Sequence, residues 1–219
     1  MNLRTGPWID PNISDYLRAH AAAPDAAQGW INERTAELGD ISRMQIGSDQ
    51  VVFMTMLTKL AGVSFAVEVG TFTGTSAMAI ARGLKPGGRL LCCDVNEEWT
   101  TIARDGWTRG GVSDRVELRL GPALETLRTL PPDAVVDLAF IDADKTNYLA
   151  YVEALLPRLR SGGLLLIDNT IWYGAVVDPS RDDADTVAIR AVNDFVAADA
   201  RLESVIVPIG DGLTVARKR

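Results

Sequence analysis

The chain has 219 residues, 47% of them hydrophobic and 23% charged, which is the composition of an ordinary globular domain. Its formal net charge of −7 argues against a protein that binds nucleic acid by neutralising phosphates. No stretch approaches the roughly 20 apolar residues of a membrane span, and the first 20 residues hold no apolar core of a signal peptide.

The amino-terminal residues 12–43 are predicted to be helical. The first run begins with Asn12 or Ser14 as a cap, and Pro24 ends it because proline cannot continue a helix. A second run covers residues 25–38, where apolar residues recur at a loose helical spacing.

Residues 48–60 form a third predicted helix, with Ser48 or Asp49 as its cap. Helical spacing places one apolar face on Val52, Met56, Leu57 and Leu60. Because the sequence pattern changes after this helix, we expect residues 1–62 to form a helical segment in front of a larger part over residues 63–219, the two making one compact domain.

The larger part alternates short apolar runs with helix-like stretches. The runs are rich in Val, Leu and Ile without clean alternation, which is typical of strands buried on both faces of a mostly parallel sheet. The predicted strands are residues 65–70, 89–95, 116–121, 136–143, 163–169, 204–210 and 213–218. Helical spacing is found in residues 75–84, 96–110, 122–130 and 145–159. This alternation predicts an α/β doubly wound fold with helices on both faces of the sheet.

The last two predicted strands are joined closely, through Asp211 and Gly212. An Asp-Gly link between two strands is a strong signal for a β-hairpin. The predicted sheet therefore has seven strands, is mostly parallel, and ends in an antiparallel hairpin.

Both cysteines of the chain, Cys92 and Cys93, are neighbours within one predicted strand. Adjacent residues of a strand point to opposite faces of the sheet, so these two thiols are not expected to form a disulfide framework. A reducing compartment, the cytoplasm, is the predicted location.

The carboxyl ends of the strands are where open α/β sheets bind ligands. Gly70 and Gly74 follow the first strand and allow a tight turn with close approach of a ligand, although the G-x-G-x-x-G fingerprint is absent. Asp94 ends the second strand, where an acid accepts hydrogen bonds from both hydroxyls of a ribose. Small residues around Ala123 leave room for a flat base. Together these features predict a nucleoside ligand; the alternative is a plain turn and a helix cap.

Oxygen ligands for a cation follow the fourth and fifth strands. Asp142 ends one strand, and Asp168 and Asn169 end the next. Two carboxylates and an amide oxygen suit Mg²⁺ or Ca²⁺ and not a structural zinc site. With His20 as the single histidine, a site of several histidines is excluded. The alternative is that these acids cap helices or pair with basic residues.

Three further side chains near these acids have candidate roles. Lys145 lies three residues after Asp142, so its amine can reach the same cleft and act as a base, or it can simply pair with Asp144. Trp172 and Tyr173 follow the fifth strand and can grip an aromatic or acyl substrate, or pack under a loop.

These motifs together resemble those of a known family. The chain resembles the cation-dependent class I S-adenosylmethionine (SAM) O-methyltransferases, the group that contains the caffeoyl-CoA and catechol O-methyltransferases. The resemblance covers most of the chain and is carried by MQIGSDQ (44–50), EVGTFTG (68–74), CDVNEE (93–98), GPALETL (121–127), FIDADKTNY (140–148), GGLLLIDNTIWYGAVVD (162–178) and PIGDGLTVARK (208–218). It implies a Rossmann-like methyltransferase fold.

The resemblance also implies roles for individual residues. SAM would be bound by Met44, Ile46, Glu68, Gly70, Thr71, Ser76, Asp94, Val95, Ala123 and Asp142. Among these, Asp94 would bind the ribose, Ala123 would lie beside the adenine, and Met44 and Ile46 would close over the methyl end. The metal would be held by Asp142, Asp168 and Asn169. Lys145 would be the general base, with Asp142 as its catalytic neighbour. The acceptor would contact Met44, Lys145, Asn169, Trp172 and Tyr173.

The function expected from this resemblance is transfer of a methyl group from SAM to a hydroxyl of a small acceptor with two vicinal oxygens. A catechol-type phenol is the first choice of acceptor, and Mg²⁺ (or Ca²⁺ or Mn²⁺) is the expected cation. A hydroxyacyl thioester on CoA or an acyl carrier protein is the alternative acceptor, and basic residues at 18, 34 and 43 would favour it. An NAD-type oxidoreductase and a non-catalytic SAM-binding protein are the alternatives of other classes. We expect the segment 1–62 to cover the cofactor and acceptor and to make contacts in a homodimer.

Overall fold

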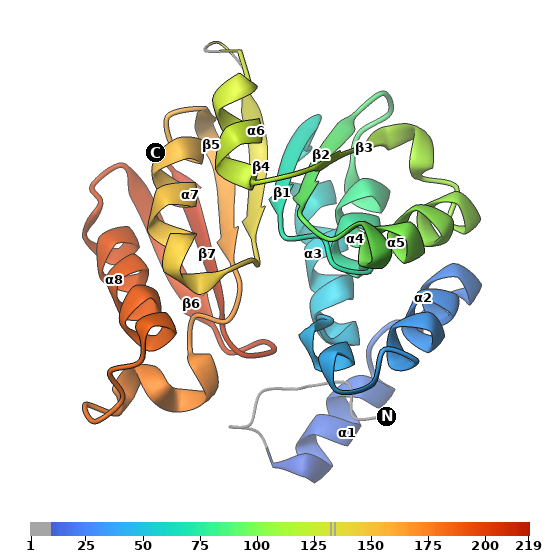
Figure 1. The fold of residues 1–219 in the computed structure, drawn as a ribbon, viewed down its shortest axis with the longest axis horizontal. Helices are drawn as coiled ribbons and strands as arrows, with labels where there is room; N and C mark the ends of the chain where they lie inside the picture. The colour runs from blue at the N-terminus through green and yellow to red at the C-terminus, as the bar shows by residue number, and fades with distance from the viewer. Residues whose placement is uncertain (1–9, 132, 134) are drawn as a thin grey trace.

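The computed structural model describes residues 10–131, 133 and 135–219 and shows a seven-stranded sheet with helices on both faces (Figure 1). The strand order is β3-β2-β1-β4-β5-β7-β6. The strands are β1 (Phe65–Val69), β2 (Arg89–Asp94), β3 (Val116–Leu120), β4 (Val136–Ile141), β5 (Leu159–Ile167), β6 (Leu202–Val207) and β7 (Leu213–Lys218). β1 to β5 pair in parallel, and β7 runs antiparallel to both β5 and β6. The predicted fold is confirmed, including its closing hairpin.

Two hydrophobic cores fill the space between the sheet and its helices. On one face lie α2 (Ala26–Ala36), α3 (Ser48–Leu60), α4 (Thr75–Gly83) and α5 (Glu97–Arg109). On the other face lie α6 (Ala123–Thr129), α7 (Tyr148–Leu155) and α8 (Ala184–Ala198). The helix α1 (Pro11–Ala19) lies at the outer end of the first group, where it contacts α3 (Figure 1). In the part of the chain that the structure describes, no helix is long and apolar enough to cross a lipid bilayer.

The inner strands show why their sequences lack clean alternation. Successive residues of β2 enter opposite cores: Leu90 and Cys92 face the first, and Leu91 and Cys93 face the second. Both thiols are free and buried, as their adjacency in the sequence predicts. Burial raises the pKa of the Cys93 thiol to about 12 and raises that of Cys92 well above its ordinary value.

The amino-terminal edge of the sheet is tied together by Asp137 at the start of β4. Its carboxylate accepts hydrogen bonds from the backbone N–H groups of Ser64 (2.7 Å) and Phe65 (2.8 Å) and from the Arg160 guanidinium. Burial alone would raise the pKa of Asp137, but the three donors outweigh it and hold the pKa below its usual value. This cluster lies at the opposite end of β4 from the residues predicted to form the site.

The helical amino-terminal part differs in detail from the prediction. α1 begins at Pro11, so neither Asn12 nor Ser14 precedes it, and the Asp10 carboxylate accepts the Asn12 N–H at 2.8 Å. α2 begins after Asp25, whose side chain accepts the Gln28 N–H at 2.9 Å. Residues 39–44 form a 3₁₀ turn, η1 (Gly39–Met44).

The prediction for α3 was wrong about its cap and its buried face. Gly47 precedes the helix without a side-chain cap, so Ser48 and Asp49 lie inside the first turn. The fully buried positions are Gln50, Met54 and Thr58, whereas Met56 and Leu60 are exposed. Thr58 packs against the backbone of Gly83 in α4, which leaves no space there for a larger side chain.

The carboxyl-terminal half holds one helix that the sequence pattern did not predict. α8 begins after Asp183, whose carboxylate accepts the Thr186 N–H at 3.0 Å. The strand limits also shift: β5 starts at Leu159, and a register shift in its pairing with β4 absorbs the added residues. β6 ends at Val207 because the next residue, Pro208, has no N–H to give to a ladder.

Candidate active site

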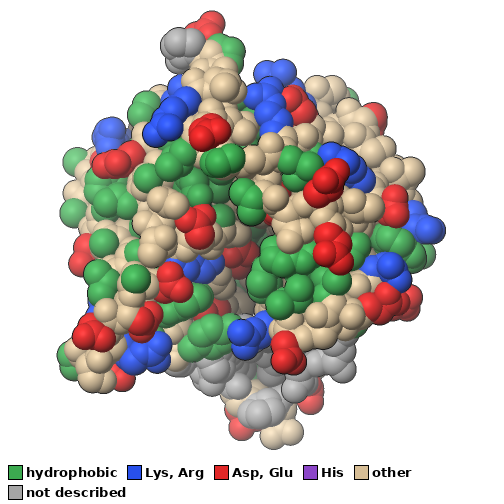
Figure 2. All heavy atoms as spheres, in the orientation of Figure 1, with side chains coloured by type: hydrophobic (Ala, Val, Ile, Leu, Met, Phe, Trp, Pro, Cys, Tyr) green, Lys and Arg blue, Asp and Glu red, His purple; other side chains and the backbone are tan. Residues whose placement is uncertain are grey.

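A large cavity opens at the carboxyl ends of β1, β2, β4 and β5. Figure 2 shows a hollow near the middle of the viewed face, with hydrophobic, acidic and basic side chains around it. The cavity volume is about 1010 Å³, the upper end of the roughly 300–1,000 Å³ typical of ligand pockets. It has space for two small molecules side by side.

The loop after β1 forms one side of the cavity and is tightly constrained. Gly70 has φ +89°, and a Cβ atom there would lie 1.9 Å from the carbonyl oxygen of Asp142 in the loop after β4. Asp94 at the end of β2 accepts the N–H groups of Thr71 and Phe72, each at 2.8 Å. Glycine is therefore required at position 70, and Asp94 fixes the loop that follows it.

Most of the residues predicted to bind SAM lie on this side of the cavity wall. They are Met44, Ile46, Gly70, Thr71, Ser76, Asp94, Val95, Ala123 and Asp142. Glu68 is the exception: its side chain is fully buried behind the wall, where it accepts a hydrogen bond from the Cys92 thiol at 3.3 Å. Burial raises the pKa of Glu68 to about 8, so this carboxyl group is mostly protonated at pH 7.

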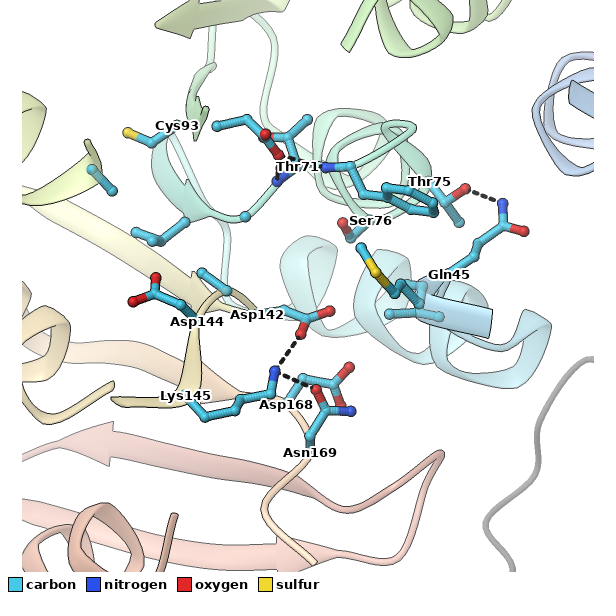
Figure 3. A pocket seen from close by; sticks show the side chains of 18 of the residues that line it. Gln45, Thr71, Thr75, Ser76, Cys93, Asp142, Asp144, Lys145, Asp168 and Asn169 are labelled. Atoms are coloured by element: carbon cyan, nitrogen blue, oxygen red, sulfur yellow. Dashed lines mark hydrogen bonds and ion pairs between the residues drawn. The ribbon is translucent and has the colours of Figure 1, made fainter. Parts of the chain in front are cut away.

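Sequence reasoning missed several wall residues on the same side. Phe72 and Trp99 meet edge to face, with ring centroids 5.1 Å apart, and both line the cavity. Tyr151 donates to Asp144 at 2.6 Å, and in Figure 3 Asp144 points away from Lys145. Trp99 and Tyr151 lie in helices, where an aromatic residue is equally well explained as a core residue, so only the structure reveals that their rings border the cavity.

Gln45, between the two predicted residues Met44 and Ile46, links the amino-terminal segment to the wall. Its amide nitrogen donates to Thr75 Oγ1 at 2.5 Å, at the start of α4 (Figure 3). Met44 is 45% exposed, whereas Ile46 is buried. The turn before α3 thus lies over the β1–α4 loop, close to where it was predicted to close over a ligand.

The candidate metal ligands converge at the tips of β4 and β5, around Lys145 (Figure 3). The Lys145 ammonium group donates to Asp142 Oδ1 (3.1 Å) and to Asn169 Oδ1 (2.6 Å). It also donates to the Tyr148 hydroxyl at 2.6 Å. Asp168 is buried beside them, and its Oδ1 accepts no hydrogen bond within the described residues.

The electrostatics of this cluster favour a cation. Burial and the neighbouring Asp142 carboxylate raise the pKa of Asp168 to about 7, while Lys145 opposes the shift. Burial, together with Asp142 and Asp168, raises the pKa of the Tyr148 phenol well above its ordinary value, so the phenol stays neutral. The described part of the chain holds no group of three His, Cys, Asp or Glu residues suited to a metal, so a cation bound here would need the amide of Asn169 as a third ligand. A hard cation with water or substrate oxygens fits two carboxylates and one amide oxygen.

The loop after β5 forms the far side of the cavity. Asn169, Trp172 and Tyr173 all have left-handed backbone conformations (φ 60°, 49° and 51°), which non-glycine residues adopt only when their surroundings hold them. The Trp172 and Tyr173 rings lie 5.8 Å apart, and the Lys145 ammonium group is 5.6 Å from the centre of the Trp172 ring. Both rings line the cavity, as does Asp211 of the β6–β7 turn. We call residues 169–174 the acceptor wall.

The chain is similar to known O-methyltransferases over most of its length. The profile of a family described as O-methyltransferase matches residues 25–219. "Probable caffeoyl-CoA O-methyltransferase 2" of Dictyostelium discoideum is 37% identical over 211 residues, covering 94% of this chain and 91% of the relative. "Caffeoyl-CoA O-methyltransferase 2" of Zea mays is 41% identical over 187 residues, covering 80% of this chain and 70% of the relative.

Solved structures show the same similarity. The O-methyltransferase from Bacillus cereus in complex with SAH superposes with a TM-score of 0.87 at 28% identity, covering 95% of this chain and 97% of that one. The O-methyltransferase TomG from Streptomyces achromogenes, in complex with SAM, superposes with a TM-score of 0.83 at 28% identity, covering 94% and 96%.

Proposed function

Because the chain belongs to the O-methyltransferase family and is a SAM-dependent O-methyltransferase of the caffeoyl-CoA type, we propose that it methylates a catechol-type phenol with the help of a divalent cation. Membership of this family excludes the oxidoreductase and the non-catalytic alternatives. The observation that carries the proposal is the cluster of Asp142, Asp168, Asn169 and Lys145 in the same cavity as the β1–α4 loop.

SAM is assigned to the side of the cavity formed by the β1–α4 loop. The proposal has Asp94 accept the ribose hydroxyls, with Val95 and Ala123 beside the adenine. Both Asp94 oxygens already accept backbone N–H groups, from Thr71 and Phe72 on one side and Asn96 on the other. A carboxylate has about four acceptor positions, so these three bonds leave one of them for a hydroxyl of the ribose.

Asp142, Asp168 and Asn169 are the residues that would hold Mg²⁺, and the unpartnered Oδ1 of Asp168 supports this assignment. When bound, the cation would fix two vicinal oxygens of the acceptor and lower the pKa of the reacting hydroxyl. A catechol presents such a pair of oxygens, and the Trp172 and Tyr173 rings offer flat surfaces for its ring.

The proposed reaction is an in-line displacement at the methyl carbon of SAM. For Lys145 to act as the base, its ammonium group first releases a proton to solvent, and Nζ then accepts the hydroxyl proton of the acceptor. The acceptor oxygen forms a bond to the methyl carbon while the carbon–sulfur bond breaks, and the electron pair of that bond stays on sulfur, which becomes a neutral thioether. Tyr148 and Asn169 orient the lysine, and the cavity walls hold the two reactants in line.

Calorimetric titration with Mg²⁺ and a methyl-transfer assay together test the proposal. We expect Asp168→Asn and Asp142→Asn to lose both Mg²⁺ binding and activity, and EDTA to abolish activity while SAH still binds. Asp105→Asn, an exposed carboxylate on α5, is the matched control and should behave as the unmodified chain does. Full activity in EDTA would contradict the metal assignment.

The acceptor class is decided by a panel that contains a free catechol, a catechol-acyl-CoA and a carrier-bound hydroxyacyl thioester. A free catechol is expected to give the highest kcat/KM. Arg43 lines the cavity and would support a CoA acceptor instead, as the names of the relatives suggest. Preference for the CoA ester would move the assignment to that class.

We also propose that the chain acts as a cytoplasmic homodimer. Exposed apolar side chains on the amino-terminal helices support contacts between two copies: Ile13, Tyr16 and Leu17 on α1, and Met56 and Leu60 on α3. Light scattering coupled to size exclusion measures the mass, and a monomer at micromolar concentration would contradict this proposal.

A further inference from the structure

Arg190 of α8 binds the chain segment that follows the acceptor wall. Its guanidinium group donates to the backbone carbonyl oxygens of Val176 (2.9 Å), Arg181 (2.7 Å) and Ala175 (2.7 Å), and also to that of Asp178. One side chain therefore holds four carbonyl groups spread over residues 175–181. Hydrogen bonds from a charged donor are stronger than neutral ones.

The first residues of segment 171–183 are bonded to Asp211, which accepts the Ile171 N–H at its carbonyl (3.0 Å) and the Tyr173 N–H at Oδ1 (2.7 Å), whereas the rest of the segment has few buried side chains. Of these residues Ala175 alone is buried, and Val177 is 83% exposed. The backbone enters the segment through left-handed conformations at Trp172, Tyr173 and Gly174. A segment with few buried apolar contacts opens easily unless hydrogen bonds restrain it, so the Arg190 contacts carry much of the restraint.

The acceptor wall is anchored separately at its other end. Asn193, one turn along α8 from Arg190, donates from Nδ2 to the carbonyl of Thr170 at 2.8 Å. The Gly212 carbonyl in the β6–β7 turn accepts both the N–H (2.9 Å) and the hydroxyl (3.0 Å) of Thr170. The two rings of the acceptor wall thus lie between these anchors at Thr170, to which the bond from the Tyr173 N–H to Asp211 Oδ1 (2.7 Å) is added, and the Arg190 contacts that begin at Ala175.

We infer that Arg190 is a positioning residue for the acceptor: it acts through the backbone of residues 175–181 to hold Trp172 and Tyr173 in their left-handed conformations at the cavity. Arg190 itself does not line the cavity, whereas both rings do. The link to the acceptor rests on the proposed function, which assigns this wall to the acceptor. The restraint of residues 175–181 by Arg190 does not depend on the proposed function, because it is argued from the hydrogen bonds alone.

The contacts require the shape of arginine and not only its charge. A guanidinium group presents five N–H donors in a rigid planar fork, whereas an ammonium group is a compact point charge. The carbonyls are reached from Nε, Nη1 and Nη2. Lysine at this position keeps the charge but cannot reach all four oxygens.

The experiment compares Arg190→Met, Arg190→Lys and the control Arg201→Met. Arg201 pairs with Asp199 beyond the end of α8, and its side chain is 56% exposed. Hydrogen exchange followed by mass spectrometry reports on the amides of Gly174, Asp178 and Arg181, which are hydrogen-bonded within the segment. For each variant we also measure the affinity for SAH and the KM for the acceptor that the acceptor panel described above selects.

Both Arg190 variants are expected to exchange faster in residues 174–181, with exchange in β4 and β5 and SAH affinity unchanged. The KM for the acceptor should rise by about tenfold in Arg190→Met, the scale of one lost charge-assisted hydrogen bond, and kcat should fall less. Arg201→Met should match the unmodified chain. Unchanged exchange in Arg190→Met would overturn the inference whatever the acceptor is. Faster exchange with an unchanged acceptor KM would overturn its link to the acceptor.

Discussion

Substitution of a glycine by alanine has two costs, the strain of a left-handed backbone and the collision of the new Cβ atom with its neighbours. Comparing Gly70 with a matched glycine, Gly87, separates the two. Gly70 and Gly87 both have positive φ, +89° and +75°. A Cβ atom at position 87 would meet nothing within 4 Å, whereas at position 70 it would lie 1.9 Å from the Asp142 carbonyl oxygen and 2.6 Å from the carbonyl carbon. Gly87→Ala therefore reports the cost of the backbone conformation alone.

The expected magnitudes follow from these geometries. A non-glycine residue in this region costs about 1–2 kcal/mol, so Gly87→Ala should lower the free energy of unfolding by that amount. The collision at position 70 adds about 1–3 kcal/mol, because the atoms in the way are backbone and cannot rotate aside. In a chain of this size about 1 kcal/mol corresponds to roughly 2–4 °C in Tm. Gly70→Ala should therefore melt several degrees below Gly87→Ala.

The position of Gly70 gives a second readout. Moving the β1 loop away from the β4 loop shifts the Thr71 and Phe72 amides and one wall of the cofactor side, so SAH affinity in Gly70→Ala should fall by about tenfold or more. Gly87→Ala should keep full affinity because that turn precedes β2, at the other end of the sheet. Differential scanning calorimetry and calorimetric titration measure the two effects. Equal melting temperatures with equal SAH affinities would refute the reasoning.

Three further outcomes are expected. Tyr148→Phe removes the hydroxyl that fixes Lys145 and should lower kcat by about tenfold without changing SAH affinity, as steady-state kinetics will show; an unchanged kcat would contradict the orienting role. Asp137→Asn should lose about 1–3 kcal/mol of stability at pH 7. The pKa of Asp137 is lower in the folded than in the unfolded chain, so its contribution to stability is complete above about pH 4 and disappears as the pH falls through the folded pKa. Urea unfolding should therefore show a smaller difference in stability between Asp137→Asn and the unmodified chain at pH 3 than at pH 7. An equal difference at both pH values would contradict this. Trp99→Ala should weaken SAH binding by about 1 kcal/mol through loss of its ring contact with Phe72, and equal binding in a titration would show that the contact is not used.

The mostly parallel sheet, its closing hairpin and the polar residues at its strand tips were predictable because they depend on local patterns. Runs such as residues 138–141 are apolar throughout, and parallel strands bring their carboxyl ends to one edge, so Asp142 and Asp168 were expected to meet. The Asp-Gly link between the last strands predicted the hairpin in the same local way.

Other parts of the site depend on partners that the sequence does not display. Arg190 binds backbone carbonyls, and any residue can supply a carbonyl, so no pattern marks its partners. Tyr148 reads as an ordinary core aromatic, and its contact with Lys145 exists only because η3 (Lys145–Asn147) turns tightly before α7. The exposure of Met56 and Leu60 likewise depends on how α3 packs against α4, which helical spacing alone does not settle.

The two cysteines of β2 allow the opening of the fold to be measured by alkylation of their thiols. The thiolate is the form of cysteine that attacks an alkylating reagent, and both sulfur atoms are buried on an inner strand with a raised pKa. The native molecule is therefore inert to the reagent, and labelling requires the sheet to open around β2. When closing is faster than alkylation, the labelling rate is proportional to the population of the opened state. Mass spectrometry of alkylated protein then gives the opening free energy of each variant under native conditions, without denaturant.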